Sequence, residues 1–193
     1  MSTIRGGALA GRRHIADAHQ TPLGAIARGL AAGVVGTALM TVAQELSARL
    51  PSSGDSQPQG DDSEQQGDLG SAPADPWEQA SMPAQVARRI SEGVFHHEVS
   101  PDKIPVLMHA MHWGYGTAWG AVYGMLQGTF GEGSVRQGIA FGAGVWAMSY
   151  VQLVPMGLNQ PPWKYPAKDT ALEIGYHLVY GAGVAAAHRR LAD

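Results

Sequence analysis

The chain has 193 residues, room for one domain of ordinary size, and its formal net charge of −3 gives no electrostatic footprint for nucleic acid. It has no cysteine, which excludes a disulfide framework, a thiolate nucleophile and a cysteine-based metal site. Ten of its 16 acidic residues fall within residues 51–105, so the charge is segregated from four long apolar runs. This pattern predicts an all-α integral membrane protein, a bundle of four glycine-rich transmembrane helices.

Residues 1–22 are polar and show no periodic apolar face, so we expect a short disordered tail. The Arg12-Arg13 pair suggests a twin-arginine export signal, but Asp17 and the distance to the first apolar run argue against one. The membrane domain is predicted to span residues 23–190.

The first apolar run predicts a helix over residues 23–46. It is uncharged from Gly29 to Gln44, which is short of the roughly 20 residues that a crossing needs. Arg28 can extend it by reaching one interface with its long side chain, and Glu45 can lie at the other. We therefore expect residues 23–46 to cross the bilayer.

The stretch that follows divides into two parts. Residues 51–75 consist mainly of Gly, Ser, Pro, Gln and Asp, a composition that cannot bury enough apolar surface to fold, so we expect a disordered loop. Residues 81–97 predict an amphipathic helix, because Val86, Ile90 and Val94 share one face. Three placements are open for this helix: in the membrane interface, docked on the bundle, or as a soluble cap of the loop.

The second crossing is predicted over residues 106–130. No permanently charged residue occurs from Ile104 to Gly131, and glycines recur every four positions within this run. In water each would destabilise a helix by about 1 kcal/mol relative to alanine. In a membrane the same spacing lets another helix approach closely. The predicted packing strip is Gly116, Gly120, Gly124 and Gly128.

Two more crossings complete the bundle. The third is predicted over residues 137–155, where Pro155 ends the helix, and an irregular proline-rich turn follows. The fourth is predicted over residues 170–188 and stops at the basic pair Arg189-Arg190. With four crossings both termini lie on one side, and the basic residues place that side in the cytoplasm.

Four crossings bring several ionisable side chains toward one membrane face, whichever way the protein is oriented. Three interpretations are open: hydrogen bonds that hold the helices together, a proton-responsive cluster, because histidine titrates near pH 6.5, or a metal site. The predicted polar cluster is Glu45, His109, His112, Glu173 and His177.

Several short motifs resemble one family of bacterial membrane proteins. They are His112-Trp-Gly-Tyr-Gly, Tyr123-Gly124, Gln137-Gly138, Pro155-Met-Gly-Leu158 with Pro161-Pro162, Glu173-Ile, His177-Leu-Val179 and Arg189-Arg190. Between about residues 106 and 190 the chain resembles the YagU-like family. The resemblance implies a small inner-membrane protein without established catalytic residues, loosely linked to acid resistance.

The motifs that the sequence contains and lacks limit the classes of function that we expect. The sequence has no phosphate-binding loop and no Gly-x-Ser-x-Gly elbow, so we expect neither an enzyme nor a cofactor. The expected partner is the lipid bilayer, with self-association or a membrane partner possible through a glycine face. We expect a multi-pass inner-membrane protein that responds to pH and contributes to acid tolerance. The alternatives are a purely structural or partner-binding membrane protein and a small proton-coupled channel or transporter.

Overall fold

The computed structural model describes residues 21–50, 75–130 and 133–192, and every regular element in these ranges is a helix. The all-α prediction is therefore confirmed for this part of the chain. The expected disordered tail and loop, residues 1–22 and 51–75, lie almost wholly outside the described residues. The elements are α1 (Pro22–Ala48), α2 (Met82–Val94), η1 (Pro101–Lys103), α3 (Ile104–Phe130), α4 (Val135–Leu153), η2 (Pro162–Lys164) and α5 (Ala167–Ala192).

Local signals set where the helices begin and end. The Thr21 side chain accepts a hydrogen bond from Gly24 N at 3.2 Å, which caps α1. At the start of α4, Ser134 and Gln137 form a reciprocal capping box, so this helix begins at Val135, two residues before the expected position. The amphipathic helix α2 ends at Val94 rather than at residue 97, and His96 adopts a positive φ of 53° just beyond it.

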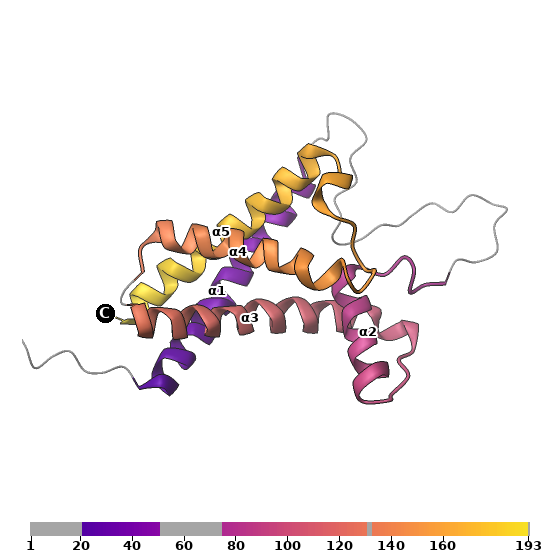
Figure 1. Ribbon diagram of the computed structural model, residues 1–193, viewed down its shortest axis with the longest axis horizontal. Coiled ribbons are helices and arrows are strands. Elements are labelled where there is room, and N and C mark those ends of the chain that lie inside the picture. The colour runs from indigo at the N-terminus through magenta and orange to yellow at the C-terminus, as the bar shows by residue number, and fades with distance from the viewer. Residues whose placement is uncertain (1–20, 51–74, 131–132, 193) are drawn as a thin grey trace, which may run out of the picture.

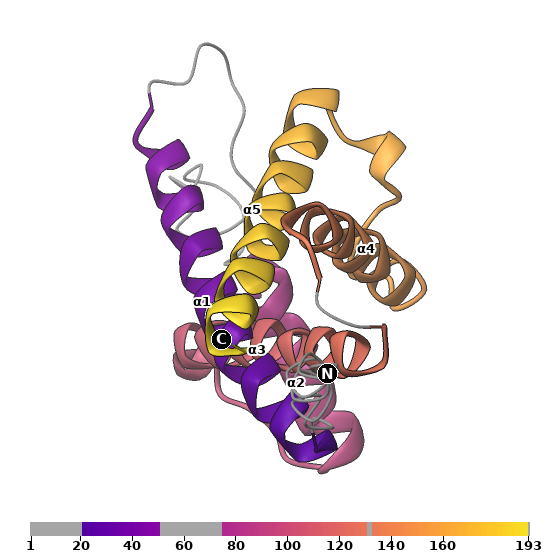
Figure 2. The same cartoon turned by 90° about the vertical axis from the view of Figure 1, so that its left-hand side faces the viewer.

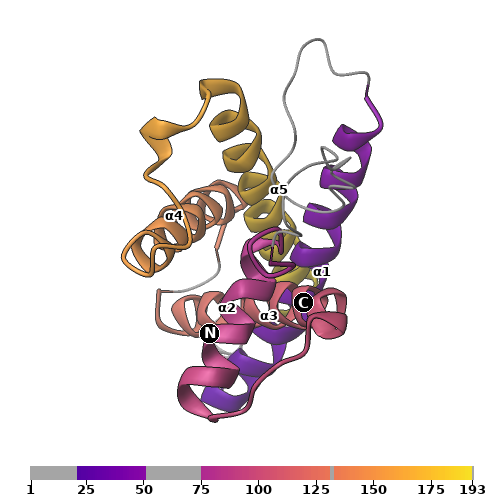
Figure 3. The same cartoon turned by 90° about the vertical axis from the view of Figure 1, so that its right-hand side faces the viewer.

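The four long helices alternate in direction. The C-terminal ends of α1 and α4 and the N-terminal ends of α3 and α5 lie in the same half of the molecule; in Figure 1 those of α1 and α5 are at the top and those of α3 and α4 are at the right. Helix α5 lies between α1 and α4, while α3 crosses α1 obliquely (Figure 2). Helix α2 packs against α3, as Figure 3 shows from the other side. Helix α1 is thus the element that joins α3 to the α4–α5 pair.

Glycines make the crossings between these helices close. A Cβ added at Gly120 would lie 2.6 Å from Gly33 N of α1, and one at Gly124 would lie 2.8 Å from the Cα of Gly29. Gly116 of α3 faces the side chain of Thr37, which also belongs to α1. Three positions of the predicted packing strip thus contact α1, whereas the surroundings of the fourth, Gly128, are not among the described features. A second glycine crossing joins α4 to α5.

Most large apolar side chains point away from these glycine-packed helix interfaces. The core is small and contains Ala32 and Val184, both 0% exposed, together with Tyr123 and Tyr180. Helix α1 shows the contrast most clearly, because its glycines and small residues face inward. Its exposed large side chains are Leu23, Leu30, Val34, Val35, Leu39, Val42 and Leu46.

Of the described helices, α1 is the one that is long and apolar enough to cross a membrane by length and composition. The sequence pattern also predicts a crossing over residues 106–130. Helix α3 is long enough, but with its glycines, histidines and aromatic residues it is not among the helices apolar enough to cross. That α3, α4 and α5 cross the membrane therefore stays a prediction.

The glycine crossing gives a stability prediction with an internal control. Replacing Gly120 with Ala places a methyl group against the backbone of α1, and overpacking of this kind costs about 1–3 kcal/mol. Gly114 lies on the same helix with no atom within 4 Å of an added Cβ, so Gly114→Ala should stay within about 1 kcal/mol of wild type. Thermal unfolding of the purified protein in detergent measures both. Equal melting temperatures for the two variants would contradict the crossing.

Candidate functional site: a polar cavity

A cavity of about 950 Å³ lies at the end of the molecule where α1 and α4 end and α3 and α5 begin. All four long helices line it, and so do α2 and the segments before α2 and after α4. The sequence-predicted residues His109, His112, Glu173 and His177 are all at its surface. The structure therefore brings four members of the predicted polar cluster to one cavity.

The fifth member, Glu45, lies outside the cavity. Its side chain is 63% exposed and pairs with Arg49 at 3.7 Å across one turn of α1. The preceding residue, Gln44, lines the cavity instead. One residue along a helix is a rotation of about 100°, which is enough to turn one neighbour inward and the other out.

Glu173 is the acid of the cavity, and its carboxylate does not pair with His177. Glu173 Oε2 accepts a hydrogen bond of 2.6 Å from the Tyr150 hydroxyl, which joins α5 to α4. The His177 ring bonds through Nδ1 to the backbone carbonyl of Glu173 at 2.8 Å. A carbonyl oxygen only accepts, so Nδ1 carries the proton and, in the neutral ring, Nε2 is the basic nitrogen.

His112 joins α3 to α1 through the hydroxyl group of Thr41. Its Nε2 lies 3.1 Å from Thr41 Oγ1, and that hydroxyl donates to the Thr37 carbonyl at 3.0 Å. The hydroxyl has one hydrogen, so its oxygen accepts from Nε2–H of His112. Thr37 in turn donates to the Gly33 carbonyl at 2.8 Å. The His112–Thr41 bond thus joins α3 to α1, while both threonine hydroxyls donate to backbone carbonyls of α1.

Tyrosines form much of the remaining wall. Tyr115 donates to Gln152 Oε1 at 2.8 Å, and Tyr180 donates to the Gly116 carbonyl at 2.6 Å. The predicted polar cluster contained none of the three tyrosines Tyr115, Tyr150 and Tyr180. Tyr180 follows His177 by three positions and so shares its side of the helix, a signal present in the sequence. No comparable signal links Tyr150 to Glu173.

The cavity is closed toward the other end of the molecule. Tyr180 lies at its surface and also belongs to the apolar core. Beyond it, the core continues through Ala32, Tyr123 and Val184, where the glycine crossings bring the helices together. The cavity therefore ends within the bundle instead of running through it.

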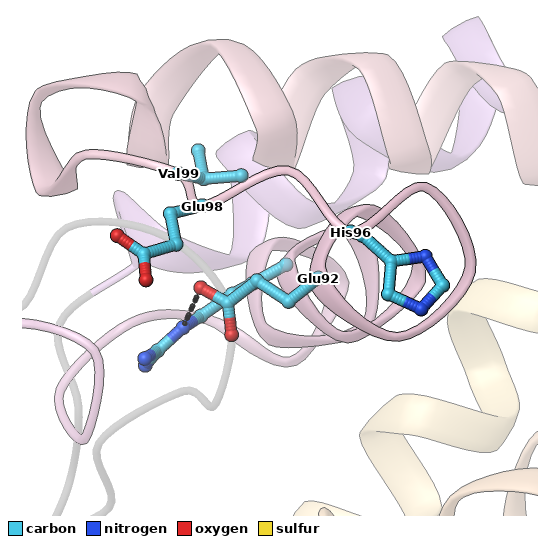
Figure 4. A pocket seen from close by; sticks show the side chains of 5 residues that line it. Glu92, His96, Glu98 and Val99 are labelled. Carbon is cyan, nitrogen blue, oxygen red and sulfur yellow. Dashed lines mark hydrogen bonds and ion pairs between the residues drawn. The ribbon is translucent and has the colours of Figure 1, made fainter.

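A second cavity, of about 600 Å³, lies beside α2 and the segment that follows it. Arg88 Nε and Glu92 Oε1 form an ion pair of 2.8 Å there, and the His96 ring extends away from that pair (Figure 4). Within the described ranges, no three His, Asp or Glu side chains are grouped to hold a metal ion, at either cavity. Four members of the predicted polar cluster thus share one cavity without forming such a site.

These features define an all-helical protein with glycine-packed helices, an apolar exterior and a polar cavity closed at one end. The family described as "Protein of unknown function (DUF1440)" matches residues 73–186, from the segment before α2 through most of α5. The chain belongs to this family, and the YagU-like assignment made from its motifs is confirmed. No curated protein and no solved structure matches the chain.

The absence of cysteine makes the cavity directly testable by chemical labelling. Ser149 lines the cavity, whereas Val184 is fully buried in the core. A hydrophilic thiol reagent should modify Ser149→Cys in the native protein, because water reaches the cavity, and should leave Val184→Cys unmodified. Both variants should react once unfolded in dodecyl sulfate. A native Ser149→Cys that reacts as slowly as Val184→Cys would show that the cavity is dry.

Proposed function

We propose that the protein is a multi-pass inner-membrane protein whose polar cavity takes up protons from one side of the membrane and changes conformation in response. The observation that carries the proposal is the cavity itself, which gathers His109, His112, His177 and Glu173 at the open end of the bundle. The proposal includes no catalytic step and no cofactor.

Four crossings are supported by where small and large side chains lie. Membrane helices associate through small residues that let their backbones approach closely, and large apolar groups then face lipid. Here Gly29, Gly33, Gly120 and Gly124 meet at one crossing. Large side chains such as Leu46, 58% exposed, are on the outside. In water such a surface would be an extended apolar patch, whereas in a bilayer lipid covers it.

The charges near the helix ends support an orientation. Exposed basic residues lie at both ends: Arg136, Arg189 and Arg190 at the closed end, and Arg49, Lys103, Lys164 and Lys168 at the open end, where Arg49 and Lys103 pair with Glu45 and Asp102. Positive charge close to helix ends favours the cytoplasmic side. Both termini are then cytoplasmic, and the cavity opens to the outside, where an acidic medium would meet it first.

Protonation would change the cavity's charge. Histidine in water titrates near pH 6.5. Protonation of the three imidazoles would add three positive charges to a space whose lining contains two carboxylates, those of Glu78 and Glu173. Like charges in a partly dry cavity repel one another, and such repulsion can shift a helix bundle from one arrangement to another.

The closed core distinguishes this proposal from the alternatives. A channel needs a continuous polar path, and the apolar core interrupts one in this conformation. The helix-joining bonds of His112 and Tyr150 equally suit a purely structural role. A purely structural role predicts no conformational change with pH, so the measured response to protons distinguishes it from the proposed function. The family's loose link to acid resistance, noted with the motifs, favours a role in acid tolerance.

Orientation can be tested with single cysteines on the two sides. Glu98 is exposed in the segment before α3, at the open end, and Arg190 is exposed at the end of α5. A membrane-impermeant thiol reagent added to intact cells should label Glu98→Cys and spare Arg190→Cys. The reverse pattern would invert the topology, and release of the protein by alkaline carbonate would remove it from the membrane altogether.

The proton response can be tested in lipid nanodiscs. Tryptophan fluorescence followed from pH 8 to pH 4 should show a transition as the imidazoles of the cavity become charged. The double variant His112→Gln with His177→Gln should lose it, because these rings line the cavity, whereas exposed His96→Gln, outside the cavity, should keep it. An unchanged transition in the double variant would leave only the structural role.

Survival of cells in acid tests the biological role separately. Cells whose protein carries Glu173→Gln or His177→Gln should survive acid less well than wild type, at equal membrane levels of the protein. The matched control is Glu45→Gln, because Glu45 is an acid at the same end of the bundle but outside the cavity. Equal survival of all strains would separate the cavity from acid tolerance.

A further inference from the structure

We propose that the cavity binds a small organic cation with apolar groups and that protons compete with this ligand. The inference rests on the proposed function in one respect, the outward-opening cavity that takes up protons. It adds a substrate class, and its evidence is the charge, the aromatic content and the size of the cavity.

The charge of the lining favours a cation. No Lys, Arg or Asp is found among the described residues that line the cavity. Its carboxylates belong to Glu78 and Glu173, so with neutral histidines the lining is negative. Its titratable residues, from every element that faces it, are Glu78, His109, His112, Tyr115, Tyr150, Tyr165, Glu173, His177 and Tyr180.

Glu173 lacks a counter-cation. Its Oε2 accepts from Tyr150, and no described residue donates a hydrogen bond to Oε1 or forms an ion pair with this carboxylate. The residue is half-buried, where an uncompensated charge is costly. A bound cation would supply the missing charge, with the Tyr150 hydroxyl holding the carboxylate in place.

Aromatic rings and thioethers suit the apolar groups of such a ligand. Three tyrosine hydroxyls, those of Tyr115, Tyr150 and Tyr180, are bonded to the protein, which fixes their rings at the cavity surface. Ring faces attract cations. Four of the eight methionines also line the cavity, and their flexible thioethers adapt to different shapes. These are Met40, Met82, Met108 and Met111.

The size of the cavity favours an organic cation over a bare ion. Sites for small organic ligands are typically about 300–1,000 Å³, and this cavity is about 950 Å³. Protonation of His109, His112 and His177 would reverse the sign of the lining. The ligand would therefore bind above the pH at which the histidines become charged and leave below it.

Tetraphenylphosphonium is a suitable probe, because tetraphenylborate has nearly the same shape and the opposite charge. Binding is measured by isothermal titration calorimetry on the full chain in detergent, first at pH 7.5. The charge variant is Glu173→Gln, and its matched control is Glu45→Gln, outside the cavity. A second variant, Ser149→Trp, fills the cavity without changing its charge.

We expect tetraphenylphosphonium to bind the wild type and Glu45→Gln equally, and Glu173→Gln and Ser149→Trp at least about tenfold more weakly, as fits the loss of one charge contact or of the space. Binding should also weaken at least about tenfold between pH 7.5 and pH 5. Tetraphenylborate, titrated into the protein alone, should not bind. Equal affinity for tetraphenylphosphonium in Glu173→Gln, or equally tight binding of tetraphenylborate to the wild type, would overturn the proposal. If Glu173→Gln does not fold, an unchanged affinity in Ser149→Trp would overturn it.

The two proposals fail separately. The proton response is measured without ligand, and the cation affinity is measured at a fixed pH of 7.5. Cation binding that depends on Glu173 in a protein without a fluorescence transition would remove the proton response alone. A transition that depends on His112 and His177, in a protein that does not bind tetraphenylphosphonium, would remove the cation site alone.

Discussion

Backbone-to-backbone contact between glycines fixes the rest of this structure. Gly29 and Gly33 of α1 meet Gly120 and Gly124 of α3 so closely that a methyl group at the crossing would strike main-chain atoms. Gly142 and Gly181 bring α4 and α5 equally close. Both crossings lie toward the closed end. The helices diverge beyond them, as the upper ends of α1 and α5 do in Figure 2, and the cavity occupies the space that they leave.

The same contacts account for the exterior. Because glycine and alanine occupy the helix interfaces, the large aliphatic side chains of α1 cannot be buried there and point outward. This arrangement reverses that of a water-soluble bundle, where large apolar residues fill the core. In the proposed bilayer setting, lipid tails would cover the aliphatic surface, and close backbone packing would hold the helices together. The polar side chains between the helices then gather in the cavity.

The sequence pattern predicted where the long helices lie along the chain, but not which helices pack against each other. Uncharged runs marked the long helices, and the four-residue spacing of glycine marked the face of α3 that packs, but nothing in the spacing named α1 as its partner. Glu45 and Gln44 differ by one position, so only the rotation of α1 against its neighbours decides which of them lines the cavity. Glu173 and His177 are four positions apart, a spacing at which side chains on one helix can pair. Instead the imidazole bonds to a carbonyl and the carboxylate to Tyr150, because a tyrosine from another helix is within reach.

The central claim is that glycine packing turns an apolar surface toward lipid and leaves a wet cavity at one end. Spin labels at Val35, 43% exposed on the outer face of α1, and at Gln152, which lines the cavity, test it most directly. In nanodiscs, the account predicts that oxygen, which dissolves in lipid, relaxes the label at Val35 more than a water-soluble nickel complex does. It predicts the opposite order at Gln152. A label at Val35 that is relaxed mainly by the nickel complex would contradict the account.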